Sequence, residues 1–221
     1  MEYRLIRSRR KTLALALSPE GELTARAPMR MPVSTIEAFI LSRQSWILRK
    51  RAELQARRDV CAPLRLTDGA TMPYRGGALT LRLTDARSAA LTGDTLALPR
   101  ASTVAAFRRW MKAQAALVFA PRVEALARSM GVSVHSVGVS FARTRWGSMT
   151  SRRDMRLNAA LLLVPPPILD YVIVHELSHI PHPDHSAAFW ACVGRALPDY
   201  PARRLWLKQH DALAQLPNDG A

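Results

Sequence analysis

One pentapeptide constrains this chain more than any other feature: residues 175–179 read HELSH, the pattern H-E-x-x-H. Residues four apart lie on the same face of an α-helix, so both histidines can bind one metal ion if the segment is helical. The apolar residues 168–174 before it are typical of a buried helix. Pro181 and Pro183 stop that helix soon after the motif. The chain therefore turns where a further metal ligand is needed.

We expect His185 to be the third ligand beside His175 and His179. It lies six residues after His179, the same separation as in the pattern H-E-x-x-H-x-x-G-x-x-H. Three neutral imidazoles leave one tetrahedral position for water, which is the arrangement of a catalytic zinc ion, Zn²⁺. His182 stands where that pattern has Gly and is an alternative third ligand.

Residues around the three histidines suggest further roles. Glu176 points about a third of a turn away from the histidine face, where it can act as general base on a water molecule. Tyr171 lies one turn before His175, where it packs in the core, orients a ligand or donates to an oxyanion. Asp184 and Asp199 are candidate acceptors for the imidazole N–H groups. The alternative for the whole motif is a buried helix whose histidines are satisfied by hydrogen bonds.

Hydrophobic periodicity differs between the two halves of the chain and predicts an α+β fold. Short alternating segments with turn residues predict an N-terminal β-rich region with one helix, residues 1–100. Helical spacing from residue 102, with a bend or restart at Pro121, opens a second domain, residues 101–221. The expected strands are 11–17, 22–27, 79–84, 95–98, 132–141 and 155–162, and the expected helices are 35–57 and 102–131.

Charge is the extreme property of the composition. The chain has 32 Lys and Arg, 28 of them Arg, against 17 Asp and Glu, which gives a net charge of +15. Such a surface attracts polyanions, so nucleic acid or a nucleotide is a candidate partner, although a merely solvated basic surface fits equally well.

No segment of the sequence is typical of a membrane or secreted protein. The longest apolar run, residues 159–164, is far shorter than the roughly 20 residues of a membrane-spanning helix. The apolar segment 13–17 is too short for a signal peptide, and only two cysteines occur. We therefore expect a cytoplasmic protein with no membrane partner.

Several segments together resemble the YgjP-like metallopeptidase family, which is related to SprT-like zinc proteases. The resemblance implies a zincin-like metallopeptidase core, gluzincin-like or metzincin-like, around an H-E-x-x-H active-site helix. It places the metal ligands at His175, His179 and His185 and the general base at Glu176. The family usually has Cys after its Trp-Gly-Ser, where this chain has Met149. The segments are 143–148 (RTRWGS), 156–158 (RLN), 169–179 (LDYVIVHELSH), 184–186 (DHS), 189–190 (FW), 10–13 (RKTL), 25–28 (ARAP) and 74–77 (YRGG).

The sequence therefore predicts a zinc-dependent metallohydrolase that cleaves peptide bonds of a polypeptide substrate with a metal-activated water. The segment 155–162 is expected to offer a strand edge to an extended substrate. We expect substrate contacts from four residues of the resembling segments: Arg145, Trp146, Asn158 and Tyr171.

Two other functions stay open. One is a metal-dependent nucleotide pyrophosphatase of the UTP type, and the other is a basic nucleic-acid-associated protein in which Trp146 stacks on a base. A histidine site with a Glu base fits carbonyl chemistry better than phosphoryl transfer, which usually recruits carboxylate-held magnesium. The arginines that would bind the phosphates are Arg143, Arg145, Arg152, Arg153 and Arg156.

Overall fold

The computed structural model describes residues 2–18, 21–60 and 64–217. The chain is a mixed α+β protein that groups into two compact units, Met1–Cys61 and Ala62–Ala221. Residues 64–100 therefore share a compact unit with the C-terminal part of the chain. The domains predicted at 1–100 and 101–221 stay a prediction, because compactness alone does not define which pieces fold or act independently.

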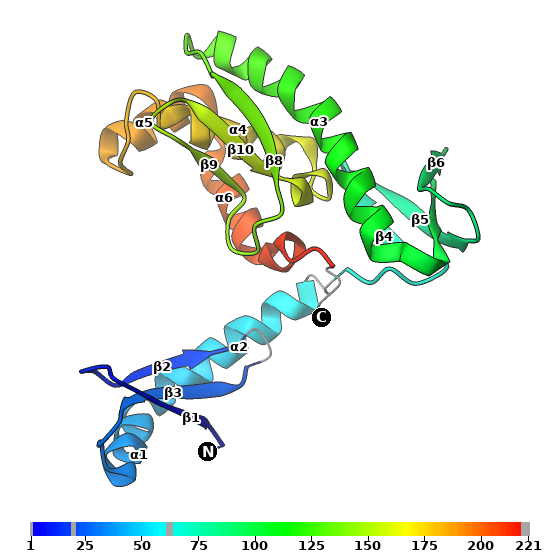
Figure 1. The fold of residues 1–221 in the computed structure, drawn as a ribbon. Helices are drawn as coiled ribbons and strands as arrows, with labels where there is room; N and C mark the ends of the chain where they lie inside the picture. Colours follow the sequence, from blue (N-terminus) through cyan, green and yellow to red (C-terminus); the bar gives the residue numbers. More distant parts are fainter. Residues whose placement is uncertain (1, 19–20, 61–63, 218–221) are drawn as a thin grey trace. The chain divides into compact units, whose positions relative to one another are not determined.

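The first unit is a three-stranded sheet covered on one face by two helices (Figure 1). Strand β3 (Leu23–Pro28) is central, parallel to β1 (Arg4–Ser8) and antiparallel to β2 (Ala14–Leu17), which confirms the predicted hairpin. The single helix expected at 35–57 is instead two helices, α1 (Val33–Ser42) and α2 (Gln44–Val60). The backbone leaves the helical conformation at Arg43, where φ is −107°.

The second unit begins with a four-stranded sheet. Its strand order is β4 (Thr71–Tyr74), β5 (Gly77–Thr84), β7 (Thr95–Pro99) and β6 (Ala90–Thr92), and the predicted strands at 79–84 and 95–98 lie in β5 and β7. Arg75 and Gly76 join β4 to β5 with φ values of 50° and 85°. Positive φ at both positions is the geometry that matches the twist of a tight hairpin.

Helix α3 (Thr103–Ser129) follows the short 3₁₀ helix η1 (Arg100–Ser102) and runs through Pro121 without interruption. A proline inside a helix removes one backbone hydrogen bond and favours a kink. Here α3 packs against β7, α4 and β8, and it has buried residues both before and after Pro121.

A second sheet of the same unit has the order β8 (Ser136–Ser140), β10 (Asp154–Asn158) and β9 (Gly147–Met149). Strand β10 is central, because it pairs in parallel with β8 and antiparallel with β9. The hypothesis that segment 155–162 offers a free edge to a substrate is therefore wrong. The second half of segment 155–162 forms the buried 3₁₀ helix η2 (Ala159–Leu162). A short apolar run is compatible with a buried helix as well as with a strand.

Helix α4 (Pro166–Ser178) lies at the centre of the second unit, and nine of its thirteen residues are buried. It packs against α3, β9, α5 (Ala187–Ala196) and α6 (Tyr200–Gln209). The short 3₁₀ helix η3 (Asp211–Ala214) is the last element of the described chain. None of the helices in the described part of the chain has the length and apolar character that crossing a membrane requires.

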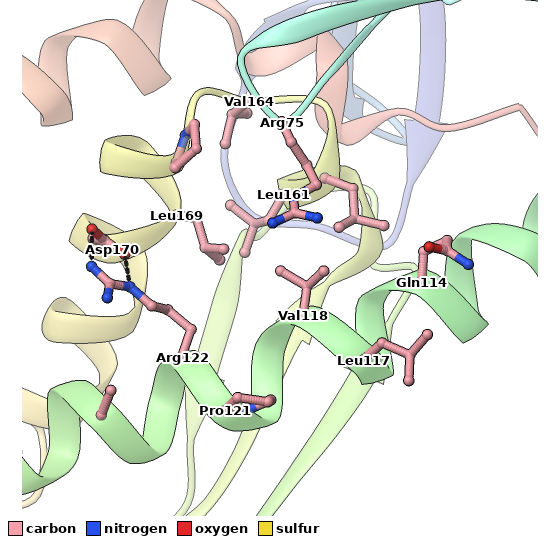
Figure 2. A pocket seen from close by; sticks show the side chains of 13 residues that line it. Arg75, Gln114, Leu117, Val118, Pro121, Arg122, Leu161, Val164, Leu169 and Asp170 are labelled. Atoms are coloured by element: carbon pink, nitrogen blue, oxygen red, sulfur yellow. Dashed lines mark hydrogen bonds and ion pairs between the residues drawn. The ribbon is translucent and has the colours of Figure 1, made fainter. Parts of the chain in front are cut away.

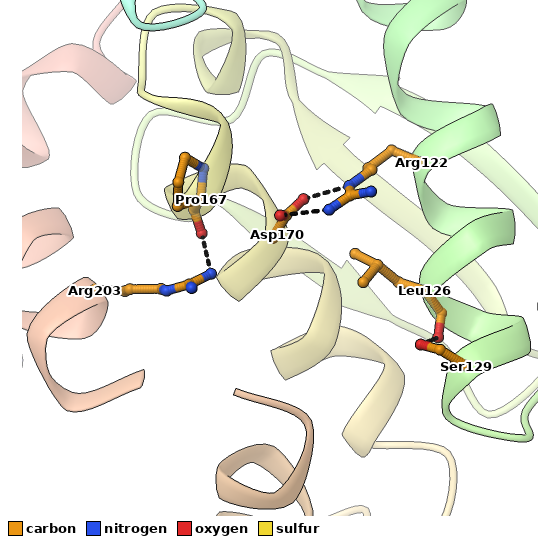
Figure 3. A network of polar contacts seen from close by, with 6 residues as sticks. All are labelled: Arg122, Leu126, Ser129, Pro167, Asp170 and Arg203. Atoms are coloured by element: carbon orange, nitrogen blue, oxygen red, sulfur yellow. Dashed lines mark hydrogen bonds and ion pairs between the residues drawn. The ribbon is translucent and has the colours of Figure 1, made fainter. Parts of the chain in front are cut away.

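Two polar contacts tie α4 to its neighbours, as Figure 3 shows. The Nε and Nη2 atoms of Arg122 on α3 donate to the two carboxylate oxygens of Asp170, each at 2.6 Å. Arg203 on α6 donates from Nη1 to the carbonyl oxygen of Pro167 at 2.8 Å. These contacts join the first half of α4 to α3 and to α6.

A cavity of about 550 Å³ lies between α3 and the first half of α4 (Figure 2). Its wall is mostly apolar, and its one acidic group, Asp170, is already paired with Arg122. Arg75 from the β4–β5 turn also lines it. None of the site residues predicted from the sequence lines this cavity.

Candidate metal centre

The three predicted histidines come together at the C-terminal end of α4. His175 lies in the last turn of the helix, His179 follows directly after its end, and His185 immediately precedes Ser186, the N-cap of α5. One ring nitrogen from each lies within 4.8 Å of the others. The Nε2 atoms of His175 and His185 are 3.2 Å apart.

The loop between α4 and α5 brings His185 back to the helix. Asp184 accepts a hydrogen bond from the backbone N–H of Ser186 at 3.2 Å, and the Ser186 hydroxyl accepts one from Phe189 N–H at 3.4 Å. This N-cap starts α5 directly after His185. His182 is half-buried and does not belong to the group of converging ligand atoms found in the described residues.

Phe189 lies against all three histidines. It is fully buried, and its ring centroid is 4.9 Å from His175, 4.7 Å from His179 and 4.8 Å from His185. One aromatic ring on the first turn of α5 thus contacts ligand candidates from two segments of the chain. The distances are those of ordinary aromatic packing.

Two of the three histidines lack the hydrogen-bond acceptors that the sequence predicts for their second ring nitrogen. Within the described residues, the buried Nδ1 atoms of His175 and His179 have no hydrogen-bond partner. Asp184 bonds Ser186, and Asp199 bonds Arg203 at 2.9 Å, so neither is seen to bond an imidazole.

Burial keeps the imidazoles in the form that binds metals. It is the main cause that lowers the pKa of His175 to about 4, with smaller effects from the charges of His179, His185 and Arg204. Burial also lowers the pKa of His179, the charge of His185 lowers it further, and the backbone carbonyls of residues 182 and 183 oppose this fall. Neutral imidazoles with free ring nitrogens are good ligands for a divalent transition metal. The residues present therefore fit such an ion.

Glu176 lies beside the histidines and is only 6% exposed. Burial raises its pKa to about 7, and the charge of Arg145 opposes this rise. Strand β9 approaches the carboxylate closely at Gly147. A Cβ atom there would lie 2.7 Å from Oε1 and 2.8 Å from Cγ of Glu176, closer than real Cβ contacts allow. Only glycine lets the strand lie against the carboxylate.

Two adjoining cavities flank this carboxylate, and Gly147, His175 and Glu176 line both. The larger, of about 660 Å³, also reaches the other two histidines, and Met149 lines it. The smaller cavity has a volume of about 240 Å³. Arg145 and Trp146, which precede Gly147 in the sequence, line it. The carboxylate and His175 thus face solvent-accessible space in two directions.

Three of the four predicted substrate-binding residues line the smaller cavity: Arg145, Trp146 and Tyr171. The fourth, Asn158, lines neither cavity. It is fully buried, and its Nδ2 donates to the carbonyls of Ala142 and Arg145, at 2.6 and 3.0 Å. The position of Asn158 indicates that it holds the loop that carries Arg145 and Trp146.

A family model described as YgjP-like, metallopeptidase domain, matches residues 11–210, which include every residue of the candidate metal centre. This chain belongs to the YgjP-like metallopeptidase family. Membership supports a hydrolase that uses a divalent metal ion.

Other comparisons add little to the YgjP-like assignment. A solved structure, the metallopeptidase zymogen of Pyrococcus abyssi abylysin, is 19% identical to this chain, covering 41% of it and 94% of the other chain with a TM-score of 0.36. A likeness this low carries no argument. None of the curated proteins compared with the chain matches it.

The sequence pattern did not reveal the roles of two residues of this YgjP-like site. Gly147 was part of a resembling segment, but its contact with Glu176 depends on how β9 packs on α4. Phe189 follows His185 by four residues, and this spacing across the start of α5 is the one sequence signal that could have placed its ring against the histidines.

Proposed function

We propose that this protein is a zinc-dependent metallopeptidase in which His175, His179 and His185 hold Zn²⁺ and Glu176 is the general base. One observation carries the proposal: three imidazoles with ring nitrogens within 4.8 Å of one another stand beside a single buried carboxylate. A zinc ion held there would act as a Lewis acid on a substrate carbonyl and lower the pKa of a water molecule at the site.

Residues of the chain transfer the proton and provide the space for the substrate. Glu176 takes the proton of the attacking water and delivers it to the leaving amine. The two cavities give room for substrate on both sides of the reacting carbonyl.

Strand β9 is the better candidate for binding an extended polypeptide than the segment first expected. It forms one edge of its sheet, and within the described residues its outer edge is unpaired. Gly147 of this strand lines both cavities. A peptide that pairs with β9 would run past Glu176 and the histidines.

The placement of the arginines supports peptide cleavage over nucleotide hydrolysis. Of the five arginines that were expected to bind phosphates, Arg145 lines the smaller cavity and Arg153 the larger, and the other three line neither. Arg156 points away from its buried strand neighbours, Met155 and Leu157. Nucleic-acid binding by the basic surface stays a separate proposal that needs no part of this site.

The test is to purify the protein, measure bound transition metal by elemental analysis, and assay cleavage of unfolded casein before and after chelation. We expect about one zinc per chain, loss of cleavage on chelation and recovery when zinc is returned. Release of pyrophosphate from UTP without any peptide cleavage would instead support the nucleotide pyrophosphatase.

The close contact at Gly147 predicts a specific loss of activity. In Gly147→Ala the new Cβ must displace either β9 or the Glu176 side chain, because both contacts are below 3.0 Å. A shift of the base by about 1 Å lowers kcat/KM by about 100-fold. Steady-state kinetics on a peptide substrate measures this loss, and metal content should stay at the wild-type level.

Gly138→Ala is the matched control. It places the same methyl group on β8, where the nearest atoms would be 3.7 and 3.9 Å away, which is ordinary van der Waals contact. This variant should keep wild-type kcat/KM. Equal activity of Gly147→Ala and Gly138→Ala would contradict the role given to the contact.

A further inference from the structure

The smaller cavity beside Glu176 has a lining that bond cleavage alone does not require. Its wall is built from the apolar side chains of Trp146, Val172 and Leu207. Two polar side chains that the proposed reaction does not use, those of Arg145 and Tyr171, join this wall. With a volume of about 240 Å³ it has room for a single side chain rather than for a long segment of substrate.

Tyr171 brings an unused hydrogen-bond donor to the cavity. Its side chain is buried, with 5% of the residue exposed, and its ring packs edge-on against His175 at 6.0 Å between centroids. Within the described residues its hydroxyl makes no hydrogen bond to the protein, and it is not one of the buried polar atoms that lack a partner, so it reaches accessible space. The hydroxyl is therefore free to donate to a group that enters the cavity.

Arg145 brings a positive charge with no ion pair of its own. Its backbone carbonyl is fixed by Asn158, whereas within the described residues its guanidinium forms neither a salt bridge nor a hydrogen bond. The charge still lies close enough to Glu176 to oppose the rise in the pKa of that group. An arginine at the mouth of a cavity can meet a carboxylate with two parallel hydrogen bonds.

The charges around the site are unevenly distributed. Glu176 is the one carboxylate among the lining residues of both cavities, while Arg145 and Arg153 also line them. A third cation, Arg204, stacks over Trp190 at 4.6 Å, and its charge is felt by both Tyr171 and His175. Among the described residues, Arg145 is the one cation that lines the smaller cavity, so an acidic group of a substrate placed there can pair with its guanidinium.

We infer that the smaller cavity is a specificity pocket for an acidic side chain, glutamate or aspartate, next to the peptide bond that is cleaved. The inference rests on the proposed peptidase function and names its substrate class. The apolar stem of a glutamate packs against Trp146, Val172 and Leu207, and its carboxylate meets the Arg145 guanidinium and the Tyr171 hydroxyl. A lysine in the same place would bring its ammonium group against the guanidinium.

The experiment compares fluorogenic peptides that differ at one position, with Glu, Gln or Lys placed in turn at each position on either side of the cleaved bond. At one of these positions we expect the zinc-loaded wild type to cleave the Glu peptide with about tenfold higher kcat/KM than the Gln peptide, the scale of one charged hydrogen bond. Arg145→Gln and Tyr171→Phe should each reduce this ratio severalfold, and Arg145→Glu should favour the Lys peptide.

Arg87→Gln is the control, because Arg87 is exposed in the β5–β6 connection and lines none of the cavities described above. It removes the same charge and should keep the wild-type ratio. Cleavage of Glu and Gln peptides with equal kcat/KM at every position would overturn the inference and leave the peptidase function standing. Failure of the zinc-loaded wild type to cleave any of the peptides or unfolded casein would overturn both.

Discussion

Glu176→Gln is expected to lower kcat/KM for peptide cleavage by about 1,000-fold while leaving the bound zinc in place. The amide keeps the shape of the carboxylate but cannot accept the proton of the attacking water, and positioned general bases contribute about 10² to 10⁴ in rate. Gln also keeps the contact with Gly147, so the strand should not move. Kinetics on peptides and elemental analysis of the same preparation measure the two quantities together.

The same substitution should stabilise the metal-free protein at high pH. Burial raises the pKa of Glu176 from its ordinary 4.5 to about 7, so the folded state holds this proton more tightly than the unfolded state. The stability that this proton gives is complete below pH 4.5 and is lost as the pH rises through 7. At pH 8 the ionised, buried carboxylate therefore lowers the free energy of unfolding by about 3 kcal/mol, and Glu176→Gln removes this loss.

His175 changes the folding stability with pH in the opposite direction to Glu176. Its pKa falls from 6.5 to about 4, so its contribution to stability is present above pH 6.5 and is lost as the pH falls through 4. Between pH 4.5 and 6.5 the two groups oppose each other in the wild type, and only the rise with pH due to His175 remains in Glu176→Gln. Chemical denaturation in the presence of a chelator, at pH 5 and pH 8, tests this. A variant no more stable than wild type at pH 8 would show that Glu176 is not strained by burial.

His185→Ala is expected to lose the metal. It removes one of the three ring nitrogens that lie within 4.8 Å, and the two remaining imidazoles make a much weaker site, with a dissociation constant at least about 100-fold higher. Titration with Co²⁺, followed by its visible absorption, measures this affinity without relying on activity.

His182→Ala tests whether His182, rather than His185 of the same loop, is the third metal ligand. The ring of His182 lies outside the converging group, so this variant should bind Co²⁺ as the wild type does. Loss of binding in His182→Ala with retention in His185→Ala would assign the third ligand to His182 instead.

The sequence was most informative where local spacing decides the geometry. His175 and His179 share a helix face by periodicity, and two prolines force the turn that returns His185, so the meeting of the three rings could be predicted before any tertiary contact was known. The strands β2, β5 and β7 were predictable for the same reason, because alternation of apolar and polar residues is a local pattern.

Features that depend on packing were not predictable in this way. The apolar run at 159–162 suits a buried strand and a buried short helix equally, and only its place beside α3 decides for η2. Asn158 was expected to bind substrate, but the structure places its amide in the support of a loop. The contact between Gly147 and Glu176 joins residues 29 positions apart and depends on how β9 approaches α4.

The ring of Phe189 has a consequence for how the protein gains and loses its ion. Because this side chain belongs to the hydrophobic core and contacts each imidazole, much of the conformational entropy of the ligands is removed when the chain folds rather than when the cation arrives. Small zinc-dependent domains, by contrast, unfold when they are stripped. Here we expect removal of the ion to leave the protein folded, so that metal can be lost and rebound without unfolding.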